Sequence, residues 1–161
     1  MIIRSIGIIL ALLACVILED SFISALPPPL YWIAPTFVIG VLIYHFVRPN
    51  FGCVWLAVGG AFLDLIGLSR VPHVVTFTLA GLVGIFLARK VFTNRSLYAT
   101  MGLGVSMMTV QVILEDIALP FSEAASVFWT RMWVFALSLF LAFFVSRRLT
   151  ALFQKLFLLR T

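Results

Sequence analysis

The sequence predicts an all-α integral membrane protein, a compact bundle of about six transmembrane helices. Hydrophobic residues make up 63% of the 161-residue chain and charged residues only 11%, with a mean hydropathy of +1.20. Soluble domains average about 45–50% apolar and about 25% charged residues, so this chain has too few polar side chains to cover a water-facing surface. Six apolar segments can be drawn, and five of them reach or approach the roughly 17–25 residues that a spanning helix needs.

The breaks between these segments carry residues that end helices. Pro27-Pro28-Pro29 lacks the backbone N–H groups that a helix uses, and Arg48-Pro49-Asn50 is typical of a tight turn. Prolines also stand in the breaks at Pro72 and Pro120. We expect one transmembrane domain over residues 1–161, with helices over residues 2–18, 30–47, 51–68, 72–88, 97–114 and 127–145.

Two segments leave alternatives open. The fourth apolar run, residues 74–88, is short: it either spans with the help of residues 71–73 or a thin bilayer, or it is re-entrant. The tail over residues 146–161 is basic and amphipathic. It either continues the last helix or lies on the inner leaflet.

Lysine and arginine are distributed unevenly between alternate connections. With six crossings and the N-terminus inside, nine face the cytoplasm and two, Arg70 and Arg131, face outward. Because cytoplasmic loops are enriched in basic residues, we expect both ends of the chain in the cytoplasm. The inward set is Arg4, Arg48, Arg89, Lys90, Arg95, Arg147, Arg148, Lys155 and Arg160.

The acidic residues all fall on the outer side in this arrangement. Two acid pairs end the same five-residue sequence, which occurs at residues 16–20 and again at residues 112–116. The repeat is either a chance event in so apolar a chain or a relic of duplication, and it places both pairs at one face. The acids are Glu19, Asp20, Asp64, Glu115, Asp116 and Glu123.

The net charge of +5 does not indicate a nucleic-acid partner, because no stretch is both basic and polar enough to follow a phosphate backbone. Membrane lipids are the expected partners of the basic loops. Cys15 and Cys53 lie inside apolar runs and do not form a disulfide framework. Leu12-Leu13-Ala14-Cys15 loosely resembles a lipid-attachment motif, but the apolar run continues beyond it and favours an unprocessed helix.

Small residues form two faces at helical spacing. Such faces let helix backbones approach closely in lipid, where association depends on packing. We expect them to form helix-packing or partner interfaces. One face carries Cys53, Ala57, Gly60, Asp64 and Gly67, and the other carries Gly7, Ala11 and Cys15.

An outer polar site is predicted from Asp64, His73, Glu115 and Asp116. An acid at membrane depth is a functional hypothesis by default, although Asp64 equally fits an interfacial carboxylate that snorkels to the surface or caps a neighbouring helix. The sequence has no zinc-binding His-Glu-x-x-His helix, no nucleophile elbow and no phosphate loop. We therefore expect no catalytic residues, no metal and no cofactor.

The stretch Gly59-Gly60-Ala61-Phe62-Leu63-Asp64-Leu65-Ile66-Gly67 resembles the Gly-rich third helix, ending in Asp, of the rod shape-determining protein MreD family. The order of features also resembles that family, with Glu19-Asp20 after the first helix and a basic loop over residues 89–95. The acid in the pair Leu114-Glu115 is similar to the acid that this family often has in its fifth helix. His73-Val74-Val75 departs from the family, which usually has glycine soon after the proline.

The resemblance implies a non-enzymatic scaffold of the bacterial cell-elongation complex in the inner membrane. It implies a bitopic MreC-like partner and an indirect link to an MreB-like filament and to wall-synthesis enzymes.

A different class, the substrate-binding component of energy-coupling-factor vitamin transporters, is similar in architecture, so fold alone does not decide. In that reading the outer acids line a closed polar cavity of several hundred Å³, and the Gly7 face meets the energising subunit. A third reading is a membrane enzyme that uses the outer acids as acid–base groups.

Overall fold

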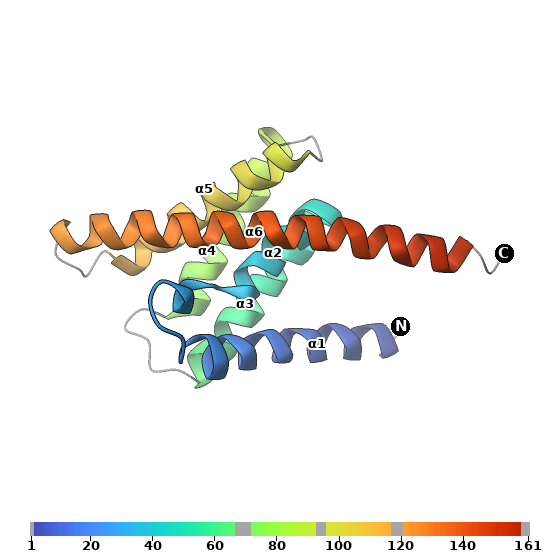
Figure 1. Ribbon diagram of the computed structural model, residues 1–161, viewed down its shortest axis with the longest axis horizontal. Coiled ribbons are helices and arrows are strands. Elements are labelled where there is room, and N and C mark those ends of the chain that lie inside the picture. Colours follow the sequence, from blue (N-terminus) through green and yellow to red (C-terminus); the bar gives the residue numbers. More distant parts are fainter. Residues whose placement is uncertain (1, 67–71, 93–95, 117–120, 159–161) are drawn as a thin grey trace.

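Every regular element that the structure describes is a helix. The computed structural model describes residues 2–66, 72–92, 96–116 and 121–158. A π-helix, η1 (Leu18–Ile23), and a short 3₁₀ helix, η2 (Leu30–Trp32), lie between the first two α-helices. The six α-helices are α1 (Ile2–Ile17), α2 (Pro35–Phe46), α3 (Pro49–Ile66), α4 (His73–Lys90), α5 (Leu97–Asp116) and α6 (Phe121–Leu158) (Figure 1). The predicted all-helical class and the number of helices are confirmed.

Four helices are long and apolar enough to cross a membrane, which indicates a membrane protein. The spans are Pro49–Ile66, His73–Lys90, Leu97–Glu115 and Val127–Arg148. At 18 residues, α4 is about 27 Å long, close to the roughly 30 Å of a bilayer's hydrocarbon core. The fourth segment is therefore a full-length helix, as the spanning alternative requires.

The short helix is α2, and here the prediction of a helix over residues 30–47 is wrong. The helix begins at Pro35 and has 12 residues, so it is about 18 Å long and does not cross a bilayer by itself. A residue before proline is driven out of the helical region, and Ala34 has φ −112° and ψ 83°. Hydropathy runs unbroken through this point, so it gave no sign of the helix start.

The last helix is much longer than the expected range of residues 127–145. Its 38 residues extend about 57 Å, and Figure 1 shows α6 projecting beyond the other helices. The tail through Leu158 continues this helix, which is the first of the two alternatives. The N-terminal end of α1 and the C-terminal end of α6 lie on the same side of the bundle (Figure 1).

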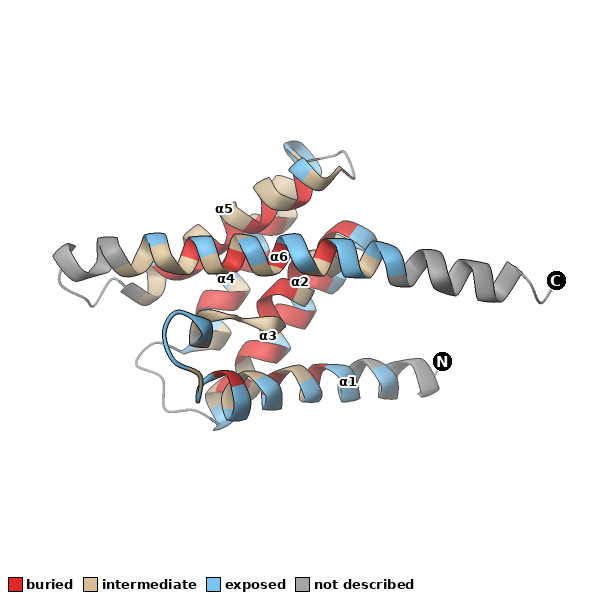
Figure 2. Ribbon diagram, in the orientation of Figure 1, coloured by how far each residue is buried: buried red, intermediate tan, exposed pale blue. Residues whose placement is uncertain are grey.

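The core lies where α2, α4 and α6 meet. Phe37 on α2 packs edge-to-face against Phe77 on α4 and Phe135 on α6, with ring centroids 5.3 and 5.6 Å apart. All three side chains are essentially inaccessible. Figure 2 shows the buried residues on the faces that the helices turn toward one another.

Helix α1 packs at the edge of the bundle, and not through Gly7 or Ala11. Leu12 and Val16 are its buried side chains, 4% and 0% exposed, and Cys15 is partly buried. No heavy atom outside the helix backbone lies within 4 Å of the position of a Cβ on Gly7, and Ala11 is exposed. The helix-packing interpretation of Gly7 and Ala11 is thus wrong for contacts within this chain, because the larger side chains on the opposite face fill the interface. A partner contact at these two residues stays a prediction.

Candidate functional site at the acidic end of the bundle

Helices α1, α3 and α5 all finish at one end of the bundle, on the left of Figure 1, which we call the acidic end. Asp64, near the end of α3, binds the first residues of α4. Its Oδ1 accepts a hydrogen bond from the His73 amide at 2.6 Å, and its Oδ2 accepts one from the Val74 amide at 2.8 Å. Because the first amides of a helix have no partner within it and carry partial positive charge, the carboxylate caps α4. Pro72 provides no side-chain cap.

His73 is the first residue of α4. Its Nδ1 lies 3.0 Å from Asp64 Oδ1. The predicted proximity of Asp64 and His73 is confirmed. It arises because the imidazole and the backbone amide of His73 both contact the same oxygen of the Asp64 carboxylate.

The glycine one turn before Asp64 permits this approach. A Cβ on Gly60 would lie 2.7 Å from the His73 carbonyl oxygen and 2.9 Å from the Val74 Cα, both backbone atoms. Further along the same face, a Cβ on Gly81 would lie 3.0 Å from Cys53 Sγ. Cys53, Gly60 and Asp64 therefore form the α3–α4 contact as predicted. Ala57 is partly buried, and Gly67 lies outside the described residues.

Glu19 plays the same part for α2. Its Oε2 accepts a hydrogen bond from the Thr36 amide at 3.0 Å, and Thr36 is the second residue of α2. That helix starts beside the middle of α3: the Trp55 indole N–H donates to the Thr36 carbonyl at 3.0 Å, and a Cβ on Gly59 would lie 2.5 Å from Thr36 Cγ2. A helix start inside the bundle has little water to satisfy its amides, and the carboxylate fills that need.

Glu115, near the end of α5, pairs with α6. Its Oε2 lies 3.1 Å from Arg131 Nη1, and its Oε1 accepts a hydrogen bond from Gln111 Nε2 at 2.9 Å. Both charged side chains are about one-fifth exposed, at 21% and 22%. The Glu115 carboxylate is thus bound by Gln111 of its own helix and by Arg131 of α6. The side chain of Asp116 lies outside the described part.

The three contacts follow one rule, and we call them the acid ties: Glu19 with Thr36, Asp64 with His73 and Val74, and Glu115 with Arg131. In each, a carboxylate at or just beyond the end of one α-helix binds the next α-helix in the chain. All three ties lie at the acidic end, where α1, α3 and α5 finish. Within the described residues no group of three His, Cys, Asp or Glu side chains could hold a metal ion.

Sequence reasoning predicts part of the acid ties. Asp64, His73 and Glu115 belong to them, whereas the sequence does not single out Glu19 as a site residue. Its run of residues 16–20 repeats the run that ends in Glu115, and that repeat was the available signal. The partner Arg131 had only been assigned to the outer side by charge counting.

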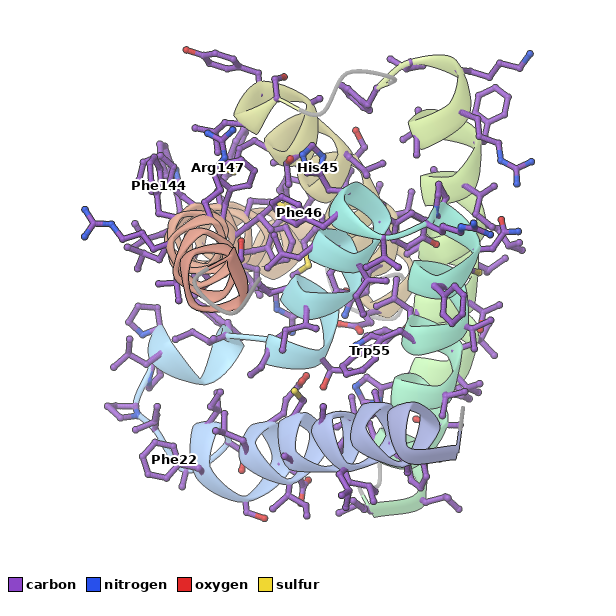
Figure 3. The ribbon with its side chains drawn as sticks, turned by 90° about the vertical axis from the view of Figure 1, so that its right-hand side faces the viewer. Phe22, His45, Phe46, Trp55, Phe144 and Arg147 are labelled. Atoms are coloured by element: carbon purple, nitrogen blue, oxygen red, sulfur yellow. The ribbon has the colours of Figure 1, made fainter. Side chains whose placement is uncertain are left out.

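The opposite end, the basic end, is joined by different chemistry. Arg89 Nη2 at the end of α4 donates to Asn50 Oδ1 at the start of α3, at 2.9 Å. On α6 the Arg147 guanidinium lies 5.5 Å from the centre of the Phe143 ring, an attractive cation–π arrangement. Figure 3 looks onto this end, with Arg147, Phe144, His45 and Phe46 gathered where α6 passes α2.

Apolar hollows lie between the described helices. One of about 460 Å³ lies between α1 and the α2–α3 pair, and one of about 190 Å³ lies between α5 and α6. Neither is lined by Asp64 or Glu115, the two acids that a polar solute site was expected to use.

Comparisons of the chain with protein-family models, with curated proteins and with solved structures found no match. Its function is therefore inferred from its own residues and their geometry.

Proposed function

We propose that this chain is a non-enzymatic membrane scaffold of the MreD kind, acting in bacterial cell elongation. It would cross the inner membrane about six times, with both ends in the cytoplasm, and bind an MreC-like bitopic protein. The second crossing would combine η2 and the residues up to Ala34 with the short α2. Through that partner it would be linked to an MreB-like filament and to wall-synthesis enzymes. The resemblance of residues 59–67 to the family's third helix supports this identity.

The observation that carries the proposal is that three acids are bound to groups of the chain itself. Asp64 and Glu19 are occupied by backbone amides of the chain itself, and Glu115 is occupied by Arg131 and Gln111. Carboxylates bound in this way hold neighbouring helices together and are not free to transfer protons or bind a solute. This favours a structural role over the membrane-enzyme reading.

The start of α2 bears on the transporter reading. In many transporters the N-terminus of a half-helix near the membrane midplane binds an anionic group of the substrate. Here the corresponding position is taken by Glu19 Oε2, 3.0 Å from the Thr36 amide. An internal carboxylate at that place favours a scaffold over a solute-binding subunit.

The face of α1 that carries Gly7 and Ala11 is the proposed contact for the bitopic partner. Gly7 and Ala11 are four residues apart and so lie on one side of the helix, and both are exposed. Leu12 and Val16, also four residues apart, face the bundle. A single partner helix is able to approach closely along such small residues.

A photo-crosslinking amino acid at Ala11, compared with the same amino acid at the buried Leu12, tests the proposal in living cells. We expect the Ala11 position to capture a bitopic wall-synthesis protein, identified by mass spectrometry, and the Leu12 position to capture none. Recovery of an ATPase module without any wall-synthesis protein would contradict the scaffold and favour the transporter subunit.

A further inference from the structure

The larger apolar hollow is a groove beside the basic end of the bundle. Helix α1 meets α3 at Leu12, which would lie 3.4 Å from a Cβ on Gly59, and diverges from it toward Gly7, as Figure 1 shows. The wedge between them has a volume of about 460 Å³. Its walls are Ile9, Leu12, Ile43, Val47, Phe51, Val54, Trp55 and Val58, and Figure 3 shows Trp55 between α1 and α2.

The groove ends next to a cation. Val47 and Phe51, two of the lining residues, flank the turn that carries Arg48 between α2 and α3. The Arg48 side chain is exposed, and no ion pair joins it to a described acid. A positive charge at one mouth of an otherwise apolar groove is complementary to an anionic amphiphile whose tail enters the groove.

We propose that the groove binds one acyl chain of an anionic phospholipid, with the lipid phosphate at Arg48. The lipid belongs to the leaflet at the basic end, where the headgroup meets the arginine and the chain runs inward past Trp55. Because lining residues such as Val54 are 60% exposed, the groove is open for a lipid to enter from the side.

The chemistry of the groove favours a lipid over a helix of another protein. The groove follows α3 from Phe51 to Val58, about 10 Å of helix rise. Its walls are apolar side chains, which suit a methylene chain, and the exposed Arg48 beside them suits a phosphate. The groove also lies on the Leu12 face of α1, away from the proposed partner face at Gly7 and Ala11, so the two proposals are independent.

Native mass spectrometry of the full chain, released from micelles with equal amounts of phosphatidylglycerol and phosphatidylcholine, tests the headgroup contact. We expect the wild-type protein to retain one phosphatidylglycerol in preference to phosphatidylcholine. Arg48→Gln should weaken that preference about fivefold, as expected for one basic residue at an anionic headgroup, and Arg48→Lys should keep it. Arg148→Gln, an equally exposed arginine on α6, is the matched control and should change nothing.

A second pair of variants tests the acyl chain. Val54→Trp fills the groove and should reduce the retention of both lipids, whereas Leu137→Trp should not, although Val54 and Leu137 are 60% and 61% exposed. Unchanged retention in Val54→Trp, or an equal loss of preference in Arg48→Gln and Arg148→Gln, overturns the proposal. A bound second copy of the chain in place of lipid overturns it as well. None of these outcomes depends on the crosslinking result for the scaffold.

Discussion

Gly60 and Asp64 act together, one turn apart on α3. The glycine lets the backbone of α4 come within contact distance, and the carboxylate then reaches the first two amides of α4. The motif that resembles the MreD family thus has a physical explanation within this chain: it joins the end of α3 to the start of α4. A larger residue at position 60 would move Asp64 away from the amides it caps.

We predict that Gly60→Ala destabilises the protein by about 1–3 kcal/mol, as overpacking typically does. The added methyl would meet the His73 carbonyl oxygen at 2.7 Å, and backbone atoms are unable to turn aside. Gly7→Ala is the matched control because its Cβ has open space, and alanine there should be neutral or slightly stabilising. Denaturant unfolding in mixed micelles gives both values, and equal values for the two variants would exclude the close α3–α4 contact.

Asp64→Ala should lower the free energy of unfolding by about 0.5–2 kcal/mol, the usual range for a lost helix cap. The variant leaves the His73 and Val74 amides without their acceptor. Asp20→Ala, at the same end of the bundle, removes a carboxylate that has no hydrogen bond to a described residue and should have a smaller effect. The two variants are compared by thermal unfolding in detergent, and a larger loss for Asp20→Ala would refute the capping role.

At the scale of elements, the acid ties join consecutive helices into three pairs, α1–α2, α3–α4 and α5–α6. The ties differ in chemistry: two bind backbone amides at a helix start, and the third binds an arginine in the third turn of α6. Both groups of the third tie are side chains, so each of them can be removed by substitution.

A double-mutant cycle with Glu115→Gln and Arg131→Met should give a coupling free energy of about 0.5–3 kcal/mol, the range for residues in direct contact. The two groups are 3.1 Å apart and mostly shielded from solvent, so each single substitution leaves a partner without its counter-charge. The measurement is unfolding of the three variants and the wild type under identical conditions. A coupling energy of zero would show that the pair does not hold α5 to α6.

The spacing of small residues and the hydropathy of the chain predict different features of these helices. The spacing of Cys53, Gly60 and Asp64 predicts one packed face of α3, and the structure confirms it. The same reasoning does not hold for Gly7 and Ala11 within this chain, because a stripe of small residues permits close packing but does not force it; a partner contact there stays a prediction. Hydropathy measures solubility in lipid, so it detects α2 and overlooks its late start at Pro35.

The candidate site was harder to predict than the fold. Glu115 and Arg131 are 16 residues apart, and their meeting depends on the rotation of two helices about their axes, which no spacing rule provides. Glu19 was expected at the membrane surface because it follows the first apolar run. Its role follows from the short α2, whose first amides lie within the bundle and require an acceptor.

At the scale of the whole molecule, charge separates the two ends of the bundle. Glu19, Asp64 and Glu115 lie at the acidic end, and Arg48, Arg89 and Arg147 lie at the other. Positive charges are retained on the cytoplasmic side during insertion, so this polarity underlies the proposed orientation.

Single cysteines at two exposed positions test that orientation. Phe22, 66% exposed, lies at the acidic end, and Tyr98, 86% exposed, lies at the start of α5. A membrane-impermeant maleimide added to intact cells should label Phe22→Cys and should label Tyr98→Cys only after the membrane is opened. Unaltered protein gives the background from Cys15 and Cys53, both of which lie within helices. The reverse labelling pattern would invert the proposed topology.

The acid ties also bear on how the protein is made. Each joins residues close in sequence, 17, 9 and 16 positions apart, and each joins a helix to its immediate successor. A ribosome therefore delivers each carboxylate first and its partner shortly afterwards, so every hairpin is able to close before the next emerges. We expect a chain interrupted after α2 or α4 to leave no tie unpaired. A chain interrupted after α3 or α5 has a carboxylate without its partner in the bilayer, and we expect quality-control proteases to degrade it.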